Sequence, residues 1–271
     1  MTTAPRLDQP LAMPRKLKLA RQRPRLWWRW AGVVAASCLL LNAKAQAQTG
    51  RLNDTGQTTC YNASNAAVAC DAATTGNTGT RPHQDGRYGR DAAASVGALQ
   101  KTGGGAAGFD FSCVLWNGTV INGPNCTAGL VANITGIASS TPATDWACTK
   151  DNVTGLVWSL QTQGPVNWNT ATGATYANAG HNTASRCGFS TGWRLPTTRE
   201  LLSIVHNGLS TGPMVDATYL PSTQNNQYGY WTSETAAFNP AYAWFVYFIN
   251  ALSSAYFKTD FHFVRLVRSG Q

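Results

Sequence analysis

Charged side chains are scarce in this sequence. Nine of its 21 basic residues and one of its 12 acidic residues precede Gln48, so the 224 residues from there on carry only 12 basic and 11 acidic side chains. Soluble proteins contain about 25% charged residues on average. The formal net charge of +9 therefore belongs to the first 47 residues. Because the remainder is near neutral, it lacks the basic character of nucleic-acid-binding proteins, and we expect no nucleic-acid partner.

The chain also lacks an apolar run long enough to cross a membrane comfortably. Its N-terminal apolar run, residues 30–41, follows a basic segment and precedes Ala43-Lys44-Ala45 and Ala45-Gln46-Ala47. A basic region, a short apolar run and small-x-small cleavage sites predict a secretory signal peptide over residues 1–47. The protein is then exported, to the periplasm, the cell surface or the extracellular space, with no membrane span in the mature chain. A retained N-terminal anchor and lipidation at Cys38 are the alternatives.

Sequence patterns of metal and redox sites are missing as well. No Cys-x-x-Cys pair occurs, and the four histidines are not spaced as a metal pair. Residues 217–271 contain only Glu234 and Asp260 as carboxylates, fewer than calcium sites use. We therefore expect no metal, no cofactor, no catalytic residue and no enzymatic activity. A secreted hydrolase or other enzyme, and a structural envelope protein without a ligand, are the alternative interpretations.

Six cysteines follow Cys38, and an even number in an exported chain is typical of disulfide bonds. Six cysteines allow fifteen pairings. Their order in the chain favours Cys60–Cys70, Cys113–Cys126 and Cys148–Cys187.

The chain changes in character near residue 145. Residues 48–144 are rich in turns and small residues, which predicts a loop-rich N-terminal module of short strands tied by disulfides. Residues 145–271 contain a capping box at Thr197 to Glu200, which predicts the start of a helix. A second helix is expected at 168–179, and strands at 155–158, 228–232, 243–249, 255–258 and 263–267. Two helices followed by an aromatic-rich β region predict an α+β domain over 145–271.

An ordered set of motifs within residues 145–271 resembles the C-terminal domain family of the Legionella collagen-like protein (Lcl). Shorter matches at 52–56, 85–91 and 108–111 resemble an extension found in many members. The motifs of the domain are Lys150-Asp151-Asn152-Val153-Thr154-Gly155-Leu156-Val157-Trp158, Cys187-Gly188-Phe189, Trp193-Arg194-Leu195-Pro196-Thr197, Tyr230-Trp231-Thr232-Ser233 and Val264-Arg265-Leu266-Val267-Arg268-Ser269-Gly270-Gln271.

This resemblance implies a C-type-lectin-like fold, in which two helices flank small antiparallel sheets. It also implies an exported binding module, which in the namesake is an adhesin for sulfated polysaccharides. The present chain departs from the namesake because it lacks a collagen-like stalk. It also lacks a basic surface near its end, where only Lys258, Arg265 and Arg268 are basic, which argues against sulfated glycans.

Aromatic residues alternate along the expected strand at 243–249. The family frame predicts that Trp244, Val246 and Phe248 face the core, so that Phe245, Tyr247 and Ile249 face outward. An exposed aromatic stripe indicates a binding surface. The alternative is that both faces are buried, with the N-terminal module covering the second. We expect a protein or cell-surface glycan ligand to contact Tyr242, Phe245, Tyr247, Ile249, Leu252, Ser254, Tyr256, Phe257, Thr259, Asp260, Phe261 and His262.

The same segment shows a restricted alphabet. From Phe245 to Phe263, apart from Lys258, every residue is one that a codon ending in C can encode. Randomised adenines in AAC codons leave this trace in variable proteins of diversity-generating retroelements, whose frame around residues 243–268 is similar. Ordinary strand composition also depletes Lys, Glu and Gln, so both explanations stay open.

Overall fold

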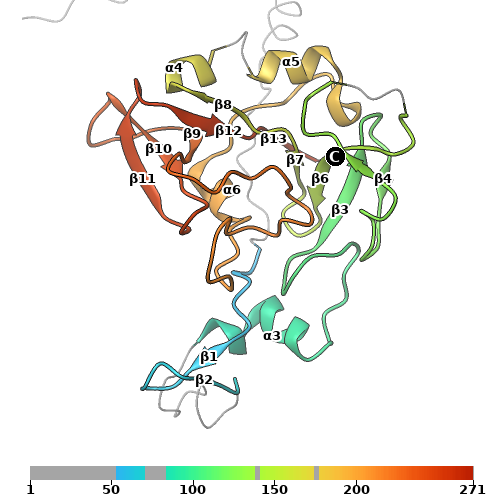
Figure 1. Cartoon of the computed structure of the whole chain (residues 1–271), viewed down its shortest axis with the longest axis vertical. Helices are drawn as coiled ribbons and strands as arrows, with labels where there is room; N and C mark the ends of the chain where they lie inside the picture. Colours follow the sequence, from blue (N-terminus) through green and yellow to red (C-terminus); the bar gives the residue numbers. More distant parts are fainter. Residues whose placement is uncertain (1–52, 71–83, 138–140, 174–176, 271) are drawn as a thin grey trace, which may run out of the picture. The chain divides into compact units, whose positions relative to one another are not determined.

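Strands dominate the fold, and most of them belong to two sheets (Figure 1). The structure is a computed structural model that describes residues 53–70, 84–137, 141–173 and 177–270. Residues from Gln48 onward cluster into one unit. The predicted signal peptide, residues 1–47, lies outside the described residues. Within the described residues, no helix is long and apolar enough to cross a membrane.

A five-stranded sheet contains the aromatic C-terminal strands. Its strand order is β11-β10-β9-β12-β8, antiparallel except for the parallel pair β9 and β12. The strands are β8 (Gln163–Val166), β9 (Tyr230–Thr235), β10 (Tyr242–Val246), β11 (Ser253–Phe257) and β12 (His262–Val264). Strand β8 forms one edge of this sheet and β11 the other. Residues 163–166 therefore lie in the same sheet as strands that come about 65 to 100 residues later in the chain.

A six-stranded sheet joins the two predicted regions of the chain. Its order is β13-β7-β6-β3-β4, with β5 also pairing with β6. Strand β3, from the predicted N-terminal module, pairs antiparallel with the central strand β6 over five residue pairs. The strands are β3 (Phe111–Leu115), β4 (Val120–Ile121), β5 (Val131–Ala132), β6 (Asp145–Asp151), β7 (Leu156–Ser159) and β13 (Val267–Ser269).

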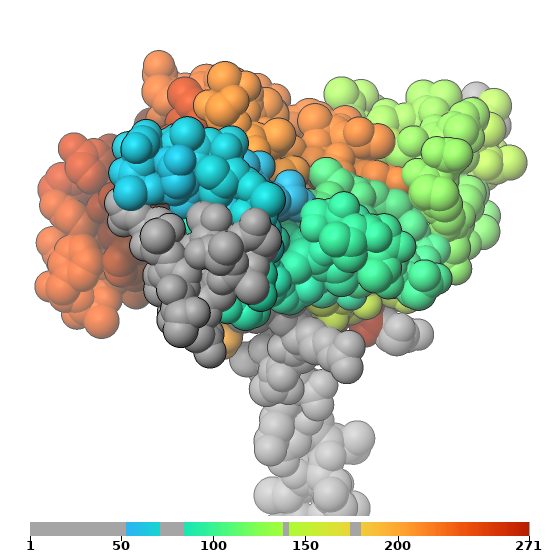
Figure 2. Space-filling view, turned by 90° about the horizontal axis from the view of Figure 1, so that it is seen from below, coloured from blue at the N-terminus to red at the C-terminus, as the bar shows by residue number. Residues whose placement is uncertain are grey.

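The beginning of the described chain packs against both its neighbours in sequence and residues near 206. It contains β1 (Cys60–Tyr61), β2 (Ala67–Val68), the 3-10 helix η1 (Asp85–Arg87) and α3 (Gly89–Ser95). Figure 2 shows the blue segment 53–70 lying against orange residues, and the Asn207 N–H donates to the Thr55 carbonyl at 2.8 Å. This hydrogen bond anchors the segment at Thr55 to the later part of the chain.

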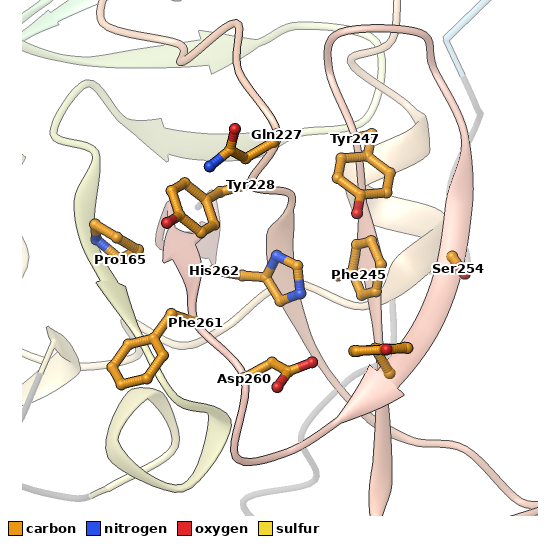
Figure 3. Close-up of a pocket in the computed structure, with 10 residues that line it drawn as sticks. Pro165, Gln227, Tyr228, Phe245, Tyr247, Ser254, Asp260, Phe261 and His262 are labelled. Atoms are coloured by element: carbon orange, nitrogen blue, oxygen red, sulfur yellow. The ribbon is translucent and has the colours of Figure 1, made fainter.

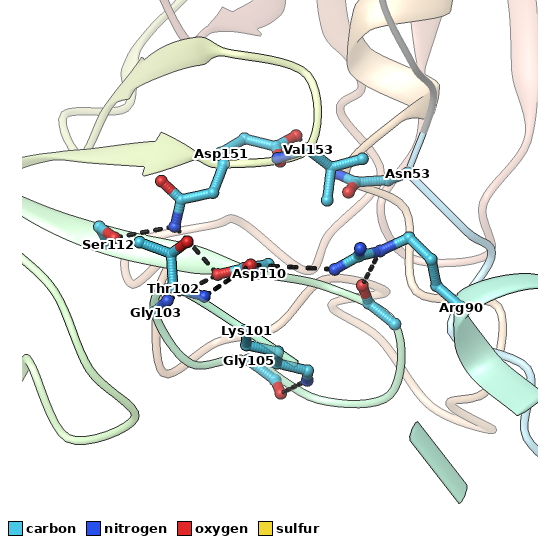
Figure 4. A network of polar contacts seen from close by, with 12 residues as sticks. Asn53, Arg90, Lys101, Thr102, Gly103, Gly105, Asp110, Ser112, Asp151 and Val153 are labelled. Carbon is cyan, nitrogen blue, oxygen red and sulfur yellow. Dashed lines mark hydrogen bonds and ion pairs between the residues drawn. The ribbon is translucent and has the colours of Figure 1, made fainter. Parts of the chain in front are cut away.

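Polar contacts fix the loops beside β3 and β6 (Figure 4). The Asp110 carboxylate accepts from the N–H groups of Thr102 and Gly103 at 3.0 and 2.7 Å, and from the Asn152 amide at 2.9 Å. The Asn53 amide donates to Asp151 at 2.5 Å. Buried carboxylates that accept several hydrogen bonds hold loop backbone in place, which explains how so turn-rich a segment is ordered.

The predicted C-type-lectin-like α+β fold, with two helices flanking small antiparallel sheets, is wrong. The fold is mostly strands, and the described α-helices are four to seven residues long. The helix expected over 168–179 is broken, because its Asn, Thr and Gly residues have low helix propensity. The helical segments of this region are α4 (Trp168–Ala171), α5 (Ala177–Thr183), the 3-10 helix η2 (Arg186–Gly188) and α6 (Thr198–Leu202).

Helix α6 begins as predicted and is five residues long. The Thr197 hydroxyl accepts from the Glu200 N–H at 3.2 Å, and the Glu200 carboxylate accepts from the Thr197 N–H at 2.8 Å, which completes the capping box. The Ser203 hydroxyl then donates to the Glu200 carbonyl, and the His206 N–H donates to the Met214 carbonyl instead of to the helix. These competing bonds end the helix after five residues.

The core lies between and around the two sheets and is rich in tryptophan. Trp158, Trp193 and Trp231 are among its largest fully buried side chains. Disulfide bonds are present, as the cysteine content predicted. They join Cys60 to Cys70, Cys113 to Cys126 and Cys148 to Cys187, the pairs that the order of the cysteines favoured. The last of these ties β6 to η2, beside the core.

Candidate ligand-binding site

A cleft of about 710 Å³ lies on one face of the five-stranded sheet (Figure 3). Its volume is within the usual range for ligand pockets, roughly 300–1,000 Å³. Most of its wall is aromatic, and we call it the aromatic cleft. It is lined by Pro165, Gln227, Tyr228, Phe245, Tyr247, Ser254, Tyr256, Asp260, Phe261 and His262.

Strand register brings the β10 and β11 residues to this face. Phe245 pairs with Ser254, and Ala243 pairs with Tyr256. Side chains directly opposite each other lie on the same face, and every second residue returns to it. Phe245, Ser254 and Tyr256 therefore point into the cleft together, and Tyr247 follows at the end of β10.

His262 forms the floor of the cleft. In Figure 3 its ring lies between Tyr228 on one side and Phe245 on the other. The His262 ring stacks on Phe245 with centroids 4.2 Å apart, and it meets Trp231 edge-on at 4.4 Å. The Gly229 N–H donates to His262 Nδ1 at 2.9 Å. A side chain at Gly229 would overlap the Phe245 ring, so this position requires glycine for close packing.

The environment of His262 fixes its protonation state. Burial lowers the pKa of His262 from 6.5 to about 4. Because Nδ1 accepts a hydrogen bond, the neutral ring carries its proton on Nε2. This buried Nε2 has no hydrogen-bond partner among the described residues. The floor of the cleft is therefore uncharged at neutral pH.

The rim of the cleft is exposed and carries one charge. Tyr256 and Phe261 are 52% and 55% exposed. Asp260 is half-buried, and its backbone N–H donates to the Phe257 carbonyl at 2.9 Å. Its carboxylate forms no ion pair within the part of the chain that the structure describes. It is the charged group among the ten lining residues.

The twelve residues predicted to contact a ligand are divided by the sheet. Seven of them line the aromatic cleft. Tyr242 and Phe257 lie on the opposite face, where their rings meet at 4.5 Å beside Phe238 and Trp244. The others, Ile249, Leu252 and Thr259, are exposed in the turns after β10 and β11.

The predicted orientation of β10 is wrong at two positions. Phe245, expected outward, is 3% exposed and packs in the core, whereas Trp244, expected in the core, is half-buried. His262, expected on an exposed surface, is 5% exposed. Both faces of β10 are packed, since Phe245 belongs to one core cluster and Val246 to another. Trp231 and His262 cover the Phe245 face. The alternative drawn from the sequence was instead that the N-terminal module covers this face.

Three lining residues were not predicted. Pro165 comes from β8, and Gln227 and Tyr228 precede β9. They reach the cleft because β12 pairs with both β8 and β9. The sequence did indicate that Tyr228 begins an aromatic strand. Its position opposite Phe245 depends on the order of strands in the sheet, which the sequence does not reveal.

The chain also contains residues of the types that hydrolases use. Gly-x-Ser-x-Gly occurs twice, with Ser190 and Ser210 at its centre, but both serines lie in bends rather than between a strand and a helix. That turn is what makes the motif a nucleophile elbow. Ser159 Oγ lies 2.8 Å from His181 Nε2, yet both side chains are buried. This pair cross-links β7 and α5 in the interior and is not open to a substrate.

One group of carboxylates stands apart from the cleft. Asp54, Asp85 and Asp91 bring ligand atoms within 4.8 Å of one another. Burial and the charges of Asp54 and Asp85 raise the pKa of Asp91, against the Gly108 N–H hydrogen bond that lowers it. Its carboxylate accepts from Gly108 at 2.7 Å, and the Thr55 hydroxyl donates to Asp85. These bonds show a structural role in joining the loops at residues 54, 85 and 108.

Residues 147–268 match the sequence model of the Lcl C-terminal domain family. No curated protein matches the chain. All ten residues of the aromatic cleft fall within the matched range. Residues 147–268, including the whole lining of the cleft, therefore form an Lcl C-terminal domain.

Proposed function

We propose that this protein is an exported, non-enzymatic binding protein of the adhesin type, which takes its ligand in the aromatic cleft. The ligand is part of a protein or glycan on a cell surface. The observation that carries the proposal is the cleft itself: exposed rings of Tyr256 and Phe261 stand above a packed floor of Phe245 and His262. Rigid aromatic anchors next to a few polar groups are the usual composition of binding surfaces.

Two further observations support the proposal. The Lcl C-terminal domain family match is consistent with a surface-associated binding role. Three disulfides fit an oxidising compartment outside the cytosol. Export itself is tested by mass spectrometry of the protein recovered from cell fractions. A new N-terminus at or next to Gln48 in the periplasmic or secreted fraction is expected, and an intact N-terminus in the cytosol would contradict export.

Binding is tested with labelled protein on whole cells and on arrays of surface glycans and proteins. Tyr256→Ala removes an exposed ring of the cleft, and we expect it to weaken binding by more than about 1 kcal/mol. Because Tyr256 is half exposed, the variant should unfold at nearly the native temperature.

Phe257→Ala is the matched control. Phe257 is the next residue of β11 and is 44% exposed, but it faces away from the cleft. Native affinity in Phe257→Ala with loss in Tyr256→Ala locates binding in the cleft. Equal loss in both, or binding unchanged by Tyr256→Ala, would place the ligand elsewhere.

Diversification of residues 245–263 by retroelement mutagenesis stays a separate prediction. Val246 and Phe248 are fully buried, so substitutions there would disturb the core. Exposed positions such as Leu252, Tyr256 and Phe261 are expected to tolerate variation. AAC-derived codons at these positions, together with a neighbouring template repeat and reverse transcriptase gene, are expected in the flanking DNA. Ordinary codon usage without such a repeat would refute this prediction.

A further inference from the structure

We propose that the aromatic cleft binds an organic cation, an alkylated or methylated ammonium group, with the Asp260 carboxylate as its counter-charge. This inference rests on the proposed function, because it names the chemical class of ligand for the same cleft.

The lining is acidic rather than basic. Asp260 carries a carboxylate, and the ten lining residues include no lysine or arginine. Asp260 makes no ion pair within the described part of the chain, so its charge is free to meet a ligand. His262 stays neutral and adds no repulsion toward a cation. An anionic ligand would meet only the Asp260 charge, which opposes it.

Aromatic rings lie on two sides of the cleft that Asp260 also lines. Figure 3 shows Tyr228 and Phe261 on one side of His262, and Phe245 and Tyr247 on the other. Tyr256 lines the same cleft from β11. The negative face of an aromatic ring attracts a cation within about 6 Å, and several rings around one centre form the cages that recognise quaternary ammonium groups.

The chain's own cation does not occupy the cleft. Lys258 is two residues from Asp260, but its ammonium group donates to the Thr235 hydroxyl at 2.8 Å and lies 4.1 Å from the centre of the Trp168 ring. Both partners hold it away from the lining residues. The space between the rings and Asp260 is therefore left for a cation from outside.

The test uses choline and its uncharged isostere 3,3-dimethylbutan-1-ol, titrated into the full chain with its disulfides intact and followed by calorimetry and NMR. We expect choline to bind, with shifts in signals of Tyr228, Tyr256 and Phe261, and the isostere to bind about tenfold or more weakly. Asp260→Asn, which removes the charge at a half-buried position, should weaken choline binding about tenfold and leave the isostere unaffected. Phe261→Leu should weaken choline binding, and Phe257→Leu should not.

Vesicles of phosphatidylcholine, against phosphatidylglycerol vesicles as control, assign the source of the cation. Sedimentation with phosphatidylcholine supports a lipid headgroup, whereas binding of free choline alone supports a soluble ligand or a cationic end of a larger one. Equal binding of choline and the isostere, or binding of methyl glucoside in the cleft without choline, would overturn the inference. The proposed function survives that result if Tyr256→Ala still abolishes attachment to cells, so the two failures are distinguishable.

Discussion

The rings of Phe245 and His262 stack with their centroids 4.2 Å apart and their planes 20° from parallel, although β9 separates their strands in the sheet. Trp231, on β9, meets His262 at 4.4 Å and Phe245 at 5.9 Å. One aromatic cluster thus extends across three strands. Its members are buried, so the floor of the cleft belongs to the core. Changes to the floor should lower stability, whereas changes to the rim should lower binding.

The first prediction separates two neighbouring aromatic residues of β10. Phe245→Ala should lower the free energy of unfolding by about 3–5 kcal/mol, because it removes a buried ring and leaves a cavity. Trp244→Ala should cost less, since Trp244 is half-buried on the other face. Urea unfolding of both variants gives the comparison. A larger loss for Trp244→Ala would contradict this prediction and indicate that Trp244 faces the core, as the sequence predicted.

The second prediction concerns acid sensitivity. Burial lowers the pKa of His262 to about 4, whereas the unfolded chain has a histidine pKa near 6.5. Between these values the unfolded chain binds a proton that the folded His262 does not, so stability falls as pH decreases from about 6.5 to 4. The full loss is at most about 3 kcal/mol, and above pH 6.5 this contribution is fully present.

His262→Asn should flatten the dependence of unfolding free energy on pH in that window, as measured by urea titrations at fixed pH. Burial also lowers the pKa of His206, and Asp260 lines the same cleft, but both remain in the variant. The difference between native protein and variant therefore isolates His262. Parallel curves for the two proteins would show that His262 is solvated and titrates normally.

Local patterns predicted those parts of the fold that depend on local chemistry. These parts are the Thr197–Glu200 capping box, the strand that ends at Ser159 and the cysteine pairs. In each case the spacing or order of the residues in the sequence indicated the structure. The cleft depends instead on sheet order. Alternation assigned one face of β10 to the core. In the structure, side chains from β9 and β12 cover Phe245 on one face, and side chains from α6 and its neighbours cover Val246 on the other. No local pattern in the sequence indicates that both faces of a strand are covered.

Helix length was also beyond local reasoning. Asn167 caps α4 by accepting from the Thr170 N–H, which is a regular helix start. The segment then stops within a turn, because the Thr172 hydroxyl bonds back to the Trp168 carbonyl and Gly173 follows. The burial of His262 depends on a parallel pairing between β12 and β9, elements 27 or more residues apart. Non-local pairing of this kind determines where the site forms, and the periodicity of the sequence does not indicate it.

The third prediction compares two disulfides. Cys148–Cys187 closes a segment of 39 residues between Cα atoms 6.2 Å apart, and Cys60–Cys70 closes one of 10 residues. The chain-entropy relation gives about 4 kcal/mol for the first and about 3 kcal/mol for the second. Replacing Cys148 and Cys187 together by Ala should cost more still, since both are buried in the core.

The double variant Cys60→Ala, Cys70→Ala is the matched control for this comparison. Thermal unfolding of both double variants measures the difference. A lower unfolding temperature for the Cys60–Cys70 double variant would contradict this prediction. It would mean that the N-terminal segment stabilises the fold by more than the closure of its short loop and its exposure indicate.

The last prediction concerns Arg265, which is fully buried between β12 and β13 without a carboxylate partner among the described residues. Its guanidinium donates to the Ser159 carbonyl at 2.9 Å, to Thr162 and Thr223 hydroxyls at 3.1 and 3.0 Å, and to the Pro221 carbonyl at 3.3 Å. Burial lowers its pKa, and the two Nη groups of the planar, branched guanidinium lie within hydrogen-bonding distance of oxygens from several segments.

Arg265→Lys keeps the charge but places it on one nitrogen that cannot reach all four oxygens, and each buried oxygen left unpaired costs about 1–3 kcal/mol. We therefore expect a loss of at least about 2 kcal/mol in urea unfolding, while Arg268→Lys, at a partly exposed position three residues later, should change stability by less than about 1 kcal/mol. Since Arg265 joins β7 to the 221–223 loop at the point where the chain passes from one sheet to the other, the variant should also broaden NMR signals of both segments. A native-like stability for Arg265→Lys would mean that charge alone, rather than the bonding geometry of the guanidinium, holds the two sheets at this point.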